Sequence, residues 1–199
     1  MTSPVLVETT GAVTTVTLNA PEYRNALGAP GLREGLNAAI AGFETDPGQR
    51  ALVLTGANGV FSAGGNLKAL VEIRDAAVFR ARLDKGAEIY RTMVGSPKIY
   101  VAAVEGPAFG AAMGLALSCD LVVAAASAQF CAAQVRVGAV PDGSLFWSLP
   151  SRAGPAVARR MFLTGEVIGA EAAVACGIAD YAAETGEALY NEHCATCHA

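Results

Sequence analysis

The sequence has 199 residues, which is enough for one domain with a full hydrophobic core. The formal net charge is −4 and there is no basic patch, which argues against nucleic acid as a partner. The longest uncharged runs near the middle, residues 106–119 and 121–135, are shorter than the roughly 18–20 residues of a membrane-spanning helix, so no membrane partner is expected. Residues 1–20 contain no basic residue and no apolar signal segment, which predicts a cytoplasmic protein.

Apolar runs and turn signals divide the chain into alternating strands and helices. β-Branched residues around a Thr-Thr-Gly-Ala turn predict a hairpin of residues 4–8 and 13–18. Pro30 fits the first turn of a helix over residues 29–44. The remaining expected elements are strand 51–55, a helical region over 67–93, strand 99–104, helix 110–118, strand 121–125, and helices 144–149, 154–163 and 170–176. This alternation indicates an α/β fold.

Two glycine-rich loops each follow an apolar strand and precede a predicted helix. The first spans residues 61–67 and contains Gly64 and Gly65, and the second spans residues 105–112. Such a loop presents free backbone N–H groups at the positive end of the helix dipole, where a phosphate or a developing oxyanion is stabilised. Each loop alone is also compatible with a plain turn. Together they could direct two N–H donors at one carbonyl oxygen.

At these loops the sequence resembles the enoyl-CoA hydratase/isomerase (crotonase) family. The resemblance covers roughly residues 5–180 and is carried by SAGGNLK at 62–68, VEGPAFGAA at 104–112, SCDL at 118–121, RNAL at 24–27, VPDG at 140–143 and LTG at 163–165. It implies a crotonase-like spiral of ββα units with truncated C-terminal helices, assembled as a homotrimer or a dimer of trimers. Residues 1–180 are then an acyl-CoA-binding domain, and residues 181–199 form a tail.

The resemblance also implies a site for a coenzyme A thioester. The thioester carbonyl would lie between the backbone N–H groups of Gly65 and Ala111, which stabilise the enolate formed when a proton leaves the neighbouring carbon. This chemistry requires no cofactor. The positions that match acyl-CoA contacts in the family are Arg24, Ala26, Ala63, Gly64, Gly65, Asn66, Leu67, Gly110, Ala111, Gly114 and Gln134.

Asp142 is the candidate acid or base, because hydratases of this family carry two glutamates whose matching positions here are Gly114 and Gln134. Neither residue exchanges a proton at neutral pH, so a proton-shuttling isomerase is favoured over a hydratase. The alternative for Asp142 is a cap of the helix that begins near residue 144. A non-catalytic acyl-CoA binder is the alternative for the whole protein.

The tail ends in Cys194-Ala-Thr-Cys197-His198, which resembles the haem attachment motif at the start of a class I cytochrome c. Cys194 and Cys197 would form thioethers to haem and His198 would bind its iron, which would make the protein an electron-transfer fusion. Two other readings stay open. The tail carries no cofactor, or its cysteines and histidines bind zinc.

Overall fold

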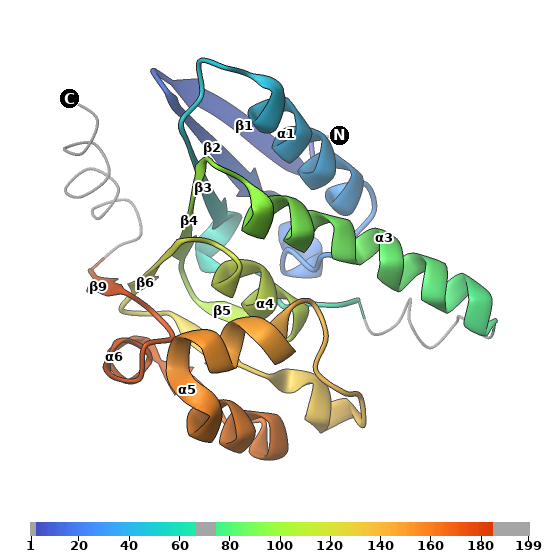
Figure 1. Ribbon diagram of the computed structural model, residues 1–199, viewed down its shortest axis with the longest axis vertical. Helices are drawn as coiled ribbons and strands as arrows, with labels where there is room; N and C mark the ends of the chain where they lie inside the picture. Colours follow the sequence, from blue (N-terminus) through green and yellow to red (C-terminus); the bar gives the residue numbers. More distant parts are fainter. Residues whose placement is uncertain (1–2, 67–74, 185–199) are drawn as a thin grey trace.

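The chain forms a six-stranded sheet and a smaller three-stranded sheet with helices packed around them (Figure 1). The computed structural model describes residues 3–66 and 75–184. In the large sheet, β1 (Val5–Thr10) and β2 (Val13–Leu18) form an antiparallel hairpin. The sheet continues in parallel with β3 (Ala51–Gly56), β4 (Ile99–Val104), β6 (Leu121–Ala125) and β9 (Tyr181–Ala183). The α/β class expected from the sequence is confirmed.

The central strands of the large sheet are buried on both faces. Leu54 on β3 belongs to the main core, whereas its neighbour Val53 joins Val101 and Val123 in a second apolar cluster. Successive side chains of a strand point to opposite faces, and parallel strands covered on both faces are continuous apolar runs in sequence. This is why these strands stand out as uninterrupted apolar stretches before the structure is known.

The described part of the chain has five α-helices around the sheets (Figure 1): α1 (Leu32–Thr45), α3 (Ala76–Gly95), α4 (Ala111–Leu117), α5 (Leu145–Thr164) and α6 (Ala170–Ala175). α1 packs on β1 and β2, and α4 packs on α5 and on β4. The small sheet comprises β5 (Pro107–Phe109), β7 (Gln129–Cys131) and β8 (Ile168–Gly169). Short 3-10 helices lie between these elements at η1 (Pro21–Tyr23), η2 (Ala57–Gly59) and η3 (Ala133–Val137).

Several element boundaries differ from the sequence-based expectation. α1 begins at Leu32 because Gly31 has φ 72°, a left-handed conformation outside the helix. The helix expected over 67–93 has its first eight residues outside the described part of the chain. Its described part begins at Ala76, where the Asp75 carboxylate accepts from the N–H of Ala77 at 2.7 Å. The helices expected over 144–149 and 154–163 are two halves of α5, which Gly154 separates with φ 79°.

The short strands β5, β7 and β8 have two or three residues each and were missed by the sequence analysis. β9 pairs with β6, so the large sheet extends to Ala183, past the boundary expected at residue 180.

Candidate functional site

A cavity of about 510 Å³ lies between α3, the end of the first glycine-rich loop, the start of α4 and the start of α5. It contains four residues singled out in the sequence, namely Gly65, Asn66, Ala111 and Asp142. The structure therefore brings the three predicted catalytic positions to one cavity, although they are 31 or more residues apart in sequence. The other residues that line it are Arg33, Leu83, Asp84, Gly86, Ala87, Tyr90, Arg91, Val94, Gly143, Ser144 and Trp147.

The two glycine-rich loops are in direct backbone contact. Ser62 donates its N–H to the Pro107 carbonyl at 2.9 Å, and its own carbonyl accepts from Phe109 at 3.1 Å. Gly64 has φ 91° and is buried, and a Cβ there would lie 2.2 Å from the Phe109 carbonyl oxygen and 3.6 Å from the Ala111 nitrogen. Only glycine fits this approach, which places residue 64 against the start of α4.

The N–H groups of Gly65 and Ala111 have no hydrogen-bond partner among the described residues. Ala111 is the first residue of α4, and the first N–H groups of a helix have no acceptor within it. Both residues line the cavity.

The Asp142 carboxylate is exposed and accepts a hydrogen bond from the Gln134 side chain, with Nε2 to Oδ1 at 2.8 Å. Gln134 lies on η3 and is 8% exposed. The alternative role of Asp142 as a helix cap is wrong. Ser144 occupies the position before α5 and makes no side-chain cap, and the Asp142 carboxylate binds Gln134 instead.

Gly114 packs against Gly143 and Ser144, the two residues that follow Asp142. A Cβ on Gly114 would be 1.8 Å from the Gly143 carbonyl oxygen and 3.3 Å from Ser144 Oγ. The Ser144 hydroxyl donates to the Gly114 carbonyl at 2.9 Å and lies 2.8 Å from Ser118 Oγ. Position 114 therefore has no room for a side chain that reaches into the cavity.

Tyr90 on α3 is a cavity residue that the sequence analysis missed, because only tertiary packing brings it to the site. Its hydroxyl donates to the Ala111 carbonyl at 3.2 Å. Burial raises the pKa of the Tyr90 phenol above its ordinary value, and the Asp142 carboxylate raises it further, whereas the Arg33 guanidinium lowers it. The phenol is therefore a neutral hydrogen-bond donor beside Asp142.

The remaining predicted coenzyme A contacts that the structure describes lie near the two glycine-rich loops and do not line the cavity. Ala63 donates its N–H to the Arg24 carbonyl at 3.0 Å, and Arg24 has an exposed side chain. Ala26, Gly110, Gly114 and Gln134 are buried nearby, and Leu67 lies outside the described residues.

Asn25, in the RNAL motif at residues 24–27, is fully buried, and the sequence analysis assigned it no role. Its Nδ2 donates to the carbonyl of Val60 at 2.6 Å, and its Oδ1 accepts from Ala20. Asn25 thus anchors the loop before Ser62.

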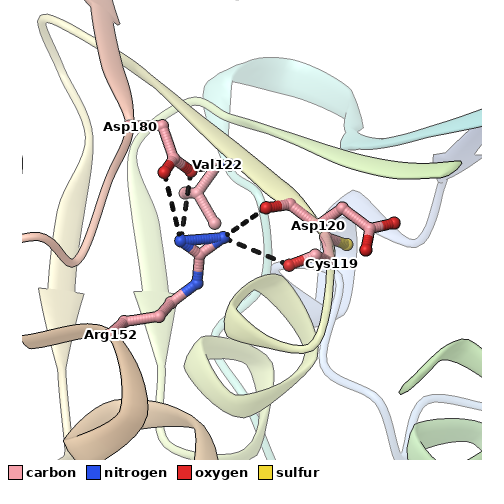
Figure 2. A network of polar contacts seen from close by, with 5 residues as sticks. All are labelled: Cys119, Asp120, Val122, Arg152 and Asp180. Atoms are coloured by element: carbon pink, nitrogen blue, oxygen red, sulfur yellow. Dashed lines mark hydrogen bonds and ion pairs between the residues drawn. The ribbon is translucent and has the colours of Figure 1, made fainter. Parts of the chain in front are cut away.

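Arg152 fixes the first half of α5 to the rest of the fold (Figure 2). Its Nη2 donates to the carbonyl oxygens of Cys119 at 3.1 Å and Asp120 at 2.9 Å, beyond the C-terminal end of α4. Its Nη1 pairs with Asp180 at 3.1 Å, and the Asp180 carboxylate accepts from the N–H of Val122 at 2.7 Å. A cation at this end also complements the helix dipole. The network holds in place the helix whose start borders the cavity.

Among residues 3–66 and 75–184, no group of three or more histidine, cysteine or acidic side chains could hold a metal ion. Nor does any helix in this part of the chain have the length and apolarity needed to cross a membrane. The haem or zinc candidates Cys194, Cys197 and His198 lie outside the described residues.

A family model described as enoyl-CoA hydratase/isomerase matches residues 8–198. The chain is 38% identical over 183 residues to a putative enoyl-CoA hydratase of Thermus thermophilus, covering 90% of this chain and 71% of that protein. It is 34% identical to the mitochondrial enoyl-CoA hydratase of Pongo abelii, covering 82% of this chain and 55% of that protein. The crystal structure of an enoyl-CoA hydratase from Polaromonas superposes with a TM-score of 0.87 at 36% identity, over 97% of this chain and 75% of that one.

Proposed function

The chain belongs to the enoyl-CoA hydratase/isomerase family, and from this premise we propose that it moves a double bond in an acyl-CoA thioester by proton transfer. The observation that carries the proposal is the shared cavity, where the Asp142 carboxylate faces the same space as two free backbone donors, those of Gly65 and Ala111.

The two backbone donors bind the thioester carbonyl oxygen in this proposal. When a proton leaves the carbon beside the carbonyl, negative charge develops on that oxygen, and the N–H groups of Gly65 and Ala111 stabilise it. Loss of one such donor costs about 2.7–4 kcal/mol of transition-state stabilisation in a well-studied protease. The contact between Gly64 and Phe109 fixes the donors before substrate binds, so no reorganisation is needed.

Asp142 carries the proton. Its carboxylate takes a proton from the carbon next to the thioester and returns it two carbons further along the chain, so the double bond shifts and no atom is gained or lost. One carboxyl group suffices for both steps. The residues at the two positions where hydratases carry glutamate support this choice. Gly114 is covered by the Gly143 backbone, and Gln134 is an amide bound to Asp142.

The experiment is to incubate the protein with 3-enoyl-CoA and 2-enoyl-CoA thioesters of several chain lengths and to identify the products by mass and NMR. Interconversion of the two at constant mass is the expected result. A gain of one water molecule would identify a hydratase instead. Binding without turnover of any thioester, in both native protein and Asp142→Asn, would identify a non-catalytic acyl-CoA binder.

Two further expectations belong to this proposal. The chemistry uses coenzyme A only as part of the substrate, and haem at Cys194 and Cys197 would be an additional group, which an intact mass with a visible spectrum tests. Assembly as a homotrimer or a dimer of trimers, which the resemblance implies, is tested by light scattering on the eluting protein.

A further inference from the structure

We propose that Gln134 is a positioning residue for Asp142, whose carboxamide partners the Asp142 carboxyl group in both of its protonation states. This rests on the proposed function, since it concerns proton transfer by Asp142. Gln134 neither gains nor loses a proton. It holds the carboxyl group in one orientation while the proton moves between substrate and Asp142.

The geometry joins Gln134 to both parts of the site. Its Nε2 donates to Asp142 Oδ1 at 2.8 Å. Its carboxamide also lies over Gly110, the residue before Ala111, where an added Cβ would be 3.7 Å from Cδ and Nε2 and 3.9 Å from Oε1. The amide is therefore held between the loop that supplies the Ala111 donor and the carboxyl group that carries the proton.

The second observation is an unpaired acceptor. Gln134 is 8% exposed, and its Oε1 is buried with no hydrogen-bond partner among the described residues. A buried acceptor without a donor is unfavourable and rare in folded proteins. A carboxamide has a donor and an acceptor face, and a half-turn about its terminal bond exchanges them. The free Oε1 is then the group that accepts the O–H of Asp142 once the carboxyl group is protonated.

No other side chain among the described residues hydrogen-bonds to the Asp142 carboxylate. The titratable and charged groups that share its cavity are Arg33 on α1, and Asp84, Tyr90 and Arg91 on α3. Tyr90 gives its hydroxyl to the Ala111 carbonyl. Gln134 is thus the single polar contact, within the described chain, that sets the direction of this carboxyl group.

The test compares Gln134→Met and Gln134→Glu with the native protein. Methionine keeps the length of the side chain but removes both the N–H and the Oε1 of the carboxamide, so the Asp142 carboxyl group loses its partner in either protonation state. Glutamate places a second carboxyl group beside it. NMR of the aspartate carboxyl carbons, with Asp142→Asn to assign the signal, reports on the surroundings of this group, and a displaced or broadened Asp142 signal is expected in both variants.

Gln49→Met is the matched control, because Gln49 is also buried, at 7% exposure, and accepts from Thr14 Oγ1 at 2.8 Å away from the cavity. In turnover assays we expect Gln134→Met to lower kcat by about 10- to 100-fold with KM little changed, as for a misplaced catalytic group. Gln49→Met should leave kcat, KM and the Asp142 carboxyl signal unchanged.

A native Asp142 carboxyl signal in both Gln134 variants would overturn the proposal. So would a native kcat in Gln134→Met. If the native protein turns over no thioester, the proposed function fails, and the NMR signal still decides whether Gln134 orients Asp142. Circular dichroism of each variant shows whether it is folded, and Gln134→Glu provides the second variant if methionine disturbs folding.

Discussion

Gly114 on α4 and Gly143 before α5 are in backbone contact, since a Cβ on Gly114 would lie 1.8 Å from the Gly143 carbonyl oxygen. In the hydratases that this sequence resembles, the position of Gly114 carries a catalytic glutamate. Here the Gly143 carbonyl group and the Ser144 hydroxyl fill that space, and the same segment carries Asp142 to the cavity. The contact between Gly114 and Gly143 therefore leaves no room for a glutamate at position 114, and it lies next to Asp142 in the chain.

Gly114→Ala is expected to destabilise the protein, because the clashing atom belongs to the backbone and cannot rotate away. Inserting a methyl group into a packed interior costs about 1–3 kcal/mol of unfolding free energy. Chemical denaturation monitored by circular dichroism measures the change. Gly42→Ala is the control, since Gly42 is exposed in the interior of α1 with nothing within 4 Å of an added Cβ. It should stabilise the protein by about 0.5–1 kcal/mol. Equal effects of the two substitutions would contradict the contact.

Asp142→Asn is expected to lower turnover of 3-enoyl-CoA by about 10²- to 10⁴-fold, the usual contribution of a positioned acid or base. Binding of the thioester should persist, because the Gly65 and Ala111 donors belong to the backbone. Steady-state kinetics and calorimetric binding separate these effects. Glu171→Gln serves as the control, since Glu171 is an exposed carboxylate in the first turn of α6. Unchanged turnover in Asp142→Asn would remove Asp142 from the mechanism.

Arg152→Met should lower the unfolding free energy by about 2–3 kcal/mol. The Arg152 side chain is 15% exposed, and its loss leaves two carbonyl oxygens and the Asp180 carboxylate without their charged donor. The Arg160–Glu166 pair provides the comparison, since the Arg160 side chain is 55% exposed. Arg160→Met should cost no more than about 1 kcal/mol. An equal loss of unfolding free energy in both variants would contradict a stabilising role for the Arg152 network shown in Figure 2.

Alkaline pH should unfold the protein through Tyr90 and Tyr100. Burial raises the pKa of both phenols, and for Tyr100 the hydrogen bond to Glu44 at 2.5 Å raises it further. Their folded-state pKa lies above the ordinary value of 10.0. The stability gained from the neutral phenols is thus complete below about pH 10 and is lost as the pH rises above it.

Absorbance of tyrosinate and circular dichroism, followed together during an alkaline titration, test this expectation. Two tyrosines should ionise only as the ellipticity is lost, and Tyr100→Phe should reduce that number by one. Ionisation of all tyrosines while the native ellipticity persists would show that neither phenol is protected.

The sequence was sufficient for the central strands and for both glycine-rich loops, because apolar runs and glycine pairs act locally. It could not show that Gln134 meets Asp142, since Gly138, with φ 70°, turns the chain between them. Tyr90 was missed for a related reason. The sequence of α3 does not reveal that its Tyr90 side chain will contact Ala111, which follows 21 residues later.

The most direct test of the mechanism is proton exchange in heavy water. The native protein is mixed with a 3-enoyl-CoA in D₂O, and the acyl chain is followed by NMR. The account predicts a shift of the double bond with deuterium entering two carbons beyond the carbon beside the thioester, where the proton is returned, and loss of both in Asp142→Asn. A bound thioester that neither gains deuterium there nor shifts its double bond would contradict it.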